Sequence, residues 1–97
     1  MKSHLNSVLI EGYLTRNPFR NDHGALILAL ESWRFWKDES EEYQKTTSYF
    51  SVRVLNEKRA QELERETRMG AGVRCVCRMS APTGKVELVA EHVEHFC

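Results

Sequence analysis

The chain has 97 residues, of which 41% are hydrophobic and 29% are charged, and this length fits one domain without room for a second independent core. Its 14 basic residues balance 14 acidic ones, which argues against a broad electrostatic attraction to nucleic acid but leaves room for a local basic surface. No apolar run reaches the roughly 18 residues of a membrane span. Glu11 and Gly12 interrupt the apolar start of the chain, which is therefore not typical of a secretory signal. We predict a single cytoplasmic domain over residues 1–97.

Two strands are predicted in the first third of the chain. Ser7–Leu14 is a short apolar run broken by Gly12, as in a strand that bends or bulges. A turn marked by Pro18 and Gly24 follows, and Ala25–Ser32 then forms the second strand.

A polar loop is expected after the second strand. The aromatic and basic stretch Trp33–Lys37 lies where that strand ends, and the acidic run Asp38–Glu42 is expected to be a solvated loop tip. The third strand, Ser48–Leu55, alternates in polarity with a period of two. One face takes Phe50, Val52 and Val54, and the other takes Tyr49, Ser51, Arg53 and Leu55.

The only convincing helix follows this strand at once. Asn56 can cap its start, Gly70–Gly72 can stop it, and Ala60, Leu63 and Thr67 give it a thin apolar stripe. The helix therefore separates the third strand from the fourth.

Two further strands complete the pattern. Val73–Met79 alternates, and after the turn Ser80–Gly84 the last strand spans Lys85–Phe96. The cysteines are odd in number, and Cys75 and Cys77 are only two residues apart, which favours a reduced protein over a disulfide framework. The alternation predicts that Val73, Cys75, Cys77 and Met79 point inward, and that Arg74, Val76 and Arg78 point outward.

The order of these elements predicts the fold class. Five strands with one helix between the third and fourth are typical of the oligonucleotide-binding fold (OB-fold), a Greek-key barrel. An α+β sandwich would produce a similar order of elements. We predict an all-β protein with one helix, arranged as a single five-stranded OB-fold barrel.

Several segments resemble bacterial single-stranded DNA-binding proteins, in register along nearly the whole chain. The first carries an asparagine, an aliphatic run, Gly12 and Leu14, and the last is the final strand of the pattern. The matching segments are Asn6–Pro18, Leu28–Trp33, Thr46–Asn56, Met69–Met79 and Val86–Phe96.

The resemblance implies a mode of binding in which bases stack on a few aromatic rings. Trp33 matches a stacking tryptophan of the family, and Tyr49 matches a stacking aromatic early in its third strand. Leu55 falls where the family often has a third aromatic residue, and the short turn Ser80–Gly84 replaces a long hairpin that carries a fourth. The family usually continues into an acidic tail beyond the barrel, so the resemblance is to a short, divergent member or to one that lacks this tail.

The candidate nucleic-acid-binding residues combine rings with neighbouring cations. Aromatic platforms bind single strands of any sequence, and arginines can neutralise phosphates. The alternatives are that Trp33 or Trp36 packs over the open end of the barrel, and that the arginines are simply solvated. The candidates are Trp33, Arg34, Trp36, Tyr49, Arg53, Leu55, Arg74 and Arg78.

Metal binding and catalysis find little support in the sequence. Cys75 and Cys77, with His92, His95 and Cys97, could supply soft ligands, but the spacing does not suit zinc. The chain has no glycine-rich phosphate loop and no nucleophile elbow. We therefore predict no cofactor, no metal and no enzymatic activity.

The predicted function is sequence-independent binding of single-stranded DNA in replication, recombination or repair. The resemblance further implies a homo-oligomer, dimer or tetramer, formed through the first strands, and contacts with replication or repair proteins near the nucleoid. The alternative is an OB-fold adaptor similar to primosomal replication proteins, acting mainly through protein–protein contacts in replication restart.

Overall fold

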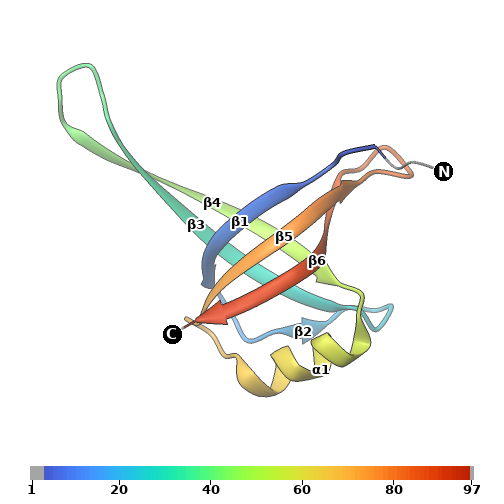
Figure 1. Cartoon of the computed structure of the whole chain (residues 1–97). Coiled ribbons are helices and arrows are strands. Elements are labelled where there is room, and N and C mark those ends of the chain that lie inside the picture. The colour runs from blue at the N-terminus through green and yellow to red at the C-terminus, as the bar shows by residue number, and fades with distance from the viewer. Residues whose placement is uncertain (1–3, 97) are drawn as a thin grey trace.

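The computed structural model describes residues 4–96, which form six strands and one helix (Figure 1). The sheet order is β1-β5-β6-β4-β3-β2, and a further pairing of β1 with β3 closes it into a barrel. All neighbours are antiparallel except β4 and β6. The elements are β1 (Val8–Leu14), β2 (Phe19–Arg20), β3 (Leu26–Lys37), β4 (Tyr43–Val54), α1 (Glu57–Glu66), β5 (Gly72–Ser80) and β6 (Glu87–Phe96).

This closed sheet confirms the predicted OB-fold barrel. The two-residue strand β2, which pairs with β3 inside the predicted turn, raises the number of strands to six. The helix therefore lies between β4 and β5 of the structure, which correspond to the third and fourth predicted strands. Within residues 4–96, no helix has the length and apolar character needed to cross a membrane.

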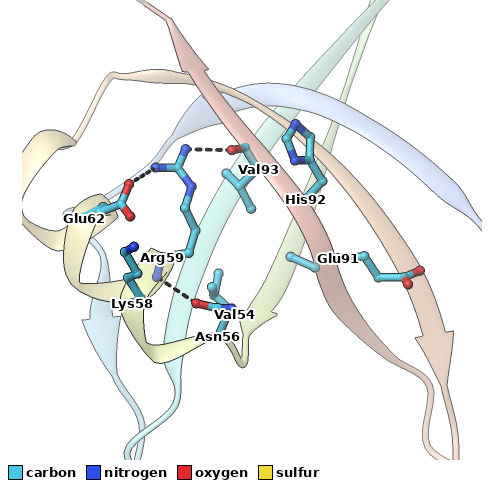
Figure 2. Close-up of a pocket in the computed structure, with 9 residues that line it drawn as sticks. Val54, Asn56, Lys58, Arg59, Glu62, Glu91, His92 and Val93 are labelled. Carbon is cyan, nitrogen blue, oxygen red and sulfur yellow. Dashed lines mark hydrogen bonds and ion pairs between the residues drawn. The ribbon is translucent and has the colours of Figure 1, made fainter.

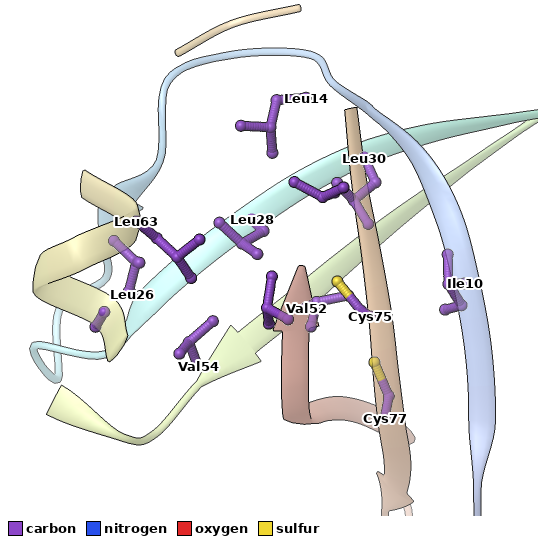
Figure 3. Close-up of a cluster of buried hydrophobic side chains, with 13 residues drawn as sticks. Ile10, Leu14, Leu26, Leu28, Leu30, Val52, Val54, Leu63, Cys75 and Cys77 are labelled. Carbon is purple, nitrogen blue, oxygen red and sulfur yellow. The ribbon is translucent and has the colours of Figure 1, made fainter. Parts of the chain in front are cut away.

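The core fills the inside of the barrel with the inward-pointing side chains of strands whose residues alternate between inside and outside (Figure 3). The predicted inward positions of β4 and β5 are confirmed for Val52, Val54, Val73, Cys75 and Cys77, all of which are buried.

The predicted inward position of Met79 is wrong, because its side chain is 47% exposed. Met79 is the penultimate residue of β5, where the strand extends past the core. It lines an open cleft there with Phe50 and Leu88.

Gly12 allows the barrel to close. An added Cβ at this position would lie 2.2 Å from the backbone oxygen of Glu31, a distance that no side chain tolerates. The next residue, Tyr13, pairs with Gly72 of β5 and with Glu31 of β3. The glycine therefore permits the close approach by which β1 passes from one neighbour to the other.

The helix is fixed to the barrel by polar contacts at its start (Figure 2). Asn56 caps it by accepting a hydrogen bond from the backbone N–H of Arg59, as predicted. Nη2 of Arg59 donates to the backbone oxygen of Val93 in β6 at 2.6 Å. Arg20 of β2 contacts the helix through ion pairs with Glu57 and Glu64.

The helix ends earlier than the glycines suggested. It stops at Glu66, because Thr67 adopts an extended backbone and its hydroxyl donates to the backbone oxygen of Leu63. The predicted apolar stripe is nevertheless confirmed, since Ala60, Leu63 and Thr67 are all buried.

The predicted polar loop between the second and third strands is wrong. β3 and β4 instead run as a long hairpin that projects from the barrel, with paired residues from Leu26 and Val54 to Lys37 and Tyr43 (Figure 1). Only the acidic tip is a turn, and Asp38 organises it by accepting hydrogen bonds from Ser40, Glu42 and Gln44. The aromatic residues of this stretch favour strand structure, and the charges beside them obscured that preference.

Candidate nucleic-acid interface

The outer face of β3 and β4, with the adjoining end of β1, presents three aromatic side chains around one carboxylate. On β3, Leu26, Leu28 and Leu30 point into the core, so the odd-numbered residues point outward. Glu31 is paired with Tyr49 on β4 and with Tyr13 on β1. Trp33 follows two residues later on the same face. The outer face therefore brings Tyr13, Trp33 and Tyr49 together, as the sequence predicted for the latter two.

The rings on this face are accessible and lie beside cations. Tyr49 is 71% exposed and Trp33 is 44% exposed. The Trp33 and Tyr13 rings lie 5.2 Å apart, centroid to centroid, at a tilt of 46°. Nζ of Lys45 lies 4.1 Å from the centroid of the Trp33 ring, within the range of a cation–π interaction. This arrangement can stack a base and contact its phosphate from the same place.

The structure divides the Trp-Arg-Phe-Trp motif between two faces. Arg34 and Trp36 are even-numbered and point to the face opposite Trp33. There Nε1 of Trp36 donates to the hydroxyl of Thr46 at 3.1 Å. The alternative in which a tryptophan packs as core is wrong, because Trp36 is 41% exposed and Trp33 is exposed as well.

Arg53 and Leu55 continue the outer face of β4 toward the helix. Arg53 forms an ion pair with Glu87 of β6, with 3.1 Å between Nη2 and the carboxylate oxygen. Leu55, directly after the strand, is 53% exposed. Between β4 and the β5–β6 turn lies an open cleft of about 590 Å³, lined among others by Tyr49, Arg53 and Lys85. This cleft adds a hollow and two cations to the aromatic face.

Arg74 and Arg78 lie on a different side of the barrel. Both belong to β5, which the sheet order separates from β3 by β1 and from β4 by β6. Arg74 is held by Glu11 at 2.7 Å and lies 3.9 Å from Glu94. Its hydrogen bond to Glu11 raises the pKa of the guanidinium. The predicted outward orientation of both arginines is confirmed by their exposure, but Arg74 is already paired with acids.

Sequence reasoning missed Tyr13 and Lys45. Tyr13 shares the outward parity of Leu9 and Glu11, a signal present in the sequence, but its place beside Trp33 depends on barrel closure. Lys45 falls in the predicted polar loop, and only its register with Phe35 shows that it lies on the outer face.

The structure offers no metal centre among residues 4–96. Cys75 and Cys77 are buried in the core, and burial raises the pKa of the Cys75 thiol to about 12. A thiol in this state is a poor metal ligand at neutral pH. Cys97 lies outside the described residues.

Comparisons with known proteins identify the fold. No family model and no curated protein sequence matches the chain. The structure is similar to a deletion mutant of the single-stranded DNA-binding protein from Thermus aquaticus, with a TM-score of 0.75 and 24% identity over 96% of this chain and 51% of that one. It is also similar to the Plasmodium falciparum protein SSB in complex with single-stranded DNA (TM-score 0.73, 15% identity, 99% of this chain and 96% of that one).

A third similar structure is the small single-stranded DNA-binding protein from Streptomyces coelicolor, with a TM-score of 0.72 and 16% identity over 97% of this chain and 96% of that one. The chain spans about half the length of the Thermus chain. The likeness confirms, at the level of fold, the resemblance to single-stranded DNA-binding proteins: this chain has their OB-fold.

Proposed function

We propose that this chain binds single-stranded DNA without sequence preference, through the outer face of β3 and β4. The observation that carries the proposal is the pair of exposed rings, Trp33 and Tyr49, on one face with Lys45 seated over the indole. Each base stacked on such a ring contributes roughly 1–3 kcal/mol, and every base has a face to stack. The proteins of similar structure, one of them in complex with single-stranded DNA, add support.

Phosphate contacts complete the proposed interface. Lys45 lies beside Trp33, and Arg53 and Lys85 line the cleft next to Tyr49. In this proposal Arg53 leaves its ion pair with Glu87 and binds a phosphate instead, and Leu55 is an apolar neighbour of this contact. The sequence also predicts Arg34, Trp36, Arg74 and Arg78 as contacts, but the first two lie on the opposite face of the hairpin and the last two lie on β5, so this proposal does not include them.

We further propose that the chain belongs to the single-stranded DNA-binding protein family and acts in replication, recombination or repair in the cytoplasm.

We also propose a homo-oligomer formed through β1. One edge of β1 is paired along Val8–Tyr13 with β5, whereas the other edge is paired with β3 only at Tyr13 and Leu14 within the described residues. Leu9 on this strand is 65% exposed. A free strand edge is a template for pairing with a second copy. Light scattering that shows a monomer would contradict this part.

The experiment for the binding proposal is a titration with poly(dT), followed by intrinsic tryptophan fluorescence at low and high salt. We expect saturable quenching, because a base stacks on Trp33, and weaker binding at high salt, because cations contact phosphates. Absence of binding at low salt would contradict the proposal and favour the adaptor alternative, in which a protein partner is the ligand.

A further inference from the structure

The distal part of the β3–β4 hairpin has two unlike faces. It comprises Trp33–Lys37 and Tyr43–Thr47 and projects from the barrel (Figure 1). Paired residues in an antiparallel hairpin share a face. Trp33 with Thr47, Phe35 with Lys45, and Lys37 with Tyr43 lie on the outer face, which we call the outer ribbon face. The opposite face carries Arg34, Trp36, Gln44 and Thr46.

The outer ribbon face exposes its rings to an unusual degree. Phe35 is 64% exposed and Tyr43 is 74% exposed. A two-stranded hairpin buries almost no apolar surface by itself, so these rings contribute little to the stability of the free protein. Exposed aromatic side chains gathered on one face mark a binding surface.

The charges on this face suit a polyanion. Nζ of Lys45 lies 4.1 Å from the centroid of the Trp33 ring, and Nζ of Lys37 lies 5.2 Å from the centroid of the Tyr43 ring. All acidic residues of the hairpin beyond Trp33 lie in the tip, Asp38–Glu42. Rings with ammonium groups beside them, and no carboxylate among them, match bases joined by phosphates.

We propose that the bound DNA strand continues from Trp33 along the outer ribbon face, over Phe35 and Tyr43, as far as the acidic tip. This inference rests on the proposed function and assigns the path of the strand. Phe35 and Tyr43 provide further stacking positions, and Lys37 and Lys45 contact the phosphates between them. The carboxylates of the tip repel phosphates and end the path. Trp36, on the opposite face, lies off the path.

The length of this path predicts how many nucleotides it holds. Lys37 lies four residues after Trp33 on β3, or about 14 Å along the strand at the rise of an antiparallel strand. A nucleic-acid strand stacked at about 3.4 Å per nucleotide covers this length with about four nucleotides.

The first test uses the two tryptophans as reporters on opposite faces. In Trp36→Phe the remaining reporter is Trp33, and in Trp33→Phe it is Trp36. Binding of labelled oligo(dT) is followed by anisotropy and tryptophan emission is recorded at saturation. We expect strong quenching of Trp33 and little quenching of Trp36. Equal quenching of both would overturn the proposed path.

The second test measures affinity in variants of the outer ribbon face. We expect Phe35→Ala and Tyr43→Ala each to weaken binding of a long oligo(dT) about fivefold or more, the effect of one lost stack. Thr46→Ala is the matched control, because it lies in the same hairpin on the opposite face. Circular dichroism melting checks that all three proteins are folded.

The outcomes separate this inference from the proposed function. If the wild-type protein does not bind oligo(dT), both fall together. If it binds and both ring variants bind equally well, the path is wrong and the proposed function stands. If the ring variants instead change the mass found by light scattering without changing affinity per chain, the outer ribbon face is a subunit contact, and the inference is overturned.

Discussion

The outer face of β3–β4 and the outer face of β5 both carry basic side chains, but the neighbours of these side chains differ. On β3–β4, exposed rings lie beside ammonium groups, as for Trp33 and Lys45. On β5, Arg74 lies between Glu11 of β1 and Glu94 of β6. The alternation of a strand tells which way an arginine points, whereas its cross-strand neighbours decide whether it is available to a ligand.

The largest effect is expected from a substitution in β1, at the junction between the two faces. Gly12 lies where β1 passes from β5 to β3, and a Cβ there would meet the Glu31 carbonyl at 2.2 Å. Overpacking of this kind costs about 1–3 kcal/mol, and we expect Gly12→Ala to reach the upper end or exceed it, because the obstacle is backbone. Urea unfolding measures the loss.

Gly24→Ala is the control for this change. Gly24 has open space around it and a φ of +80°, so alanine meets only the left-handed backbone penalty of about 1 kcal/mol. A smaller loss for Gly12→Ala than for Gly24→Ala would show that β1 does not approach β3 as closely as described.

The next largest effect is on DNA binding, and it is tested by comparing one residue from the β3–β4 face with one from the β5 face. Tyr49→Ala removes a ring that is 71% exposed, and we expect oligo(dT) binding to weaken by about 1–3 kcal/mol. Arg74→Ala removes a cation that two carboxylates already neutralise, so we expect a change within about twofold. Anisotropy of a labelled oligonucleotide measures both. An equal loss in the two variants would place the DNA across β5 as well.

A smaller effect concerns the salt dependence of binding. Lys45→Met removes the ammonium over Trp33 and keeps an apolar side chain of similar length. We expect the slope of log affinity against log salt to fall in magnitude by about 0.7, the contribution of one phosphate on a single strand. Lys58→Met, on the helix, is the control and should leave the slope unchanged. An unaltered slope for Lys45→Met would remove this lysine from the interface.

The smallest expected effect is local and depends on pH. Hydrogen bonds from Ser40 and Gln44, followed by the backbone of Glu42, lower the pKa of Asp38 below its ordinary value of 3.8. A carboxylate with a lowered pKa stabilises the turn above pH 3.8, and this contribution is lost as the pH falls through the lowered pKa. The amide signals of Ser40 and Glu42 should therefore shift in acid while the barrel signals persist.

Asp38→Ala should show the acid form of the turn already at pH 7. Glu39→Gln, in the same turn, is the control, since the turn contacts involve Asp38 and not Glu39. An unchanged turn spectrum in Asp38→Ala would contradict this role of the carboxylate.

The two halves of the β3–β4 hairpin explain how far the sequence could predict the structure. In the half of the hairpin that belongs to the barrel, one face is buried and the other is exposed to solvent, so Val52 and Val54 alternate with polar residues in the sequence. Beyond the barrel both faces are exposed, so burial does not separate an apolar side from a polar one. Trp33–Lys37 therefore has aromatic residues on both faces, and its sequence shows no alternation that would predict a strand.

Contacts between distant segments limited the prediction of the candidate site. Trp33 and Tyr49 were found through a family resemblance that extends along the chain. The pair of Arg74 with Glu11 joins residues 63 positions apart, and the place of Tyr13 depends on the closure of β1 on β3. No local pattern contains this information.

The most direct test of the central claim is a map of amide chemical-shift changes in the ¹⁵N-labelled protein on titration with oligo(dT). The account predicts that the largest shifts fall on the outward residues of β3 and β4 and on Tyr13, while Arg74, Val76 and Arg78 on β5 change little. Shifts centred on β5, or no shifts at saturating oligonucleotide, would contradict it.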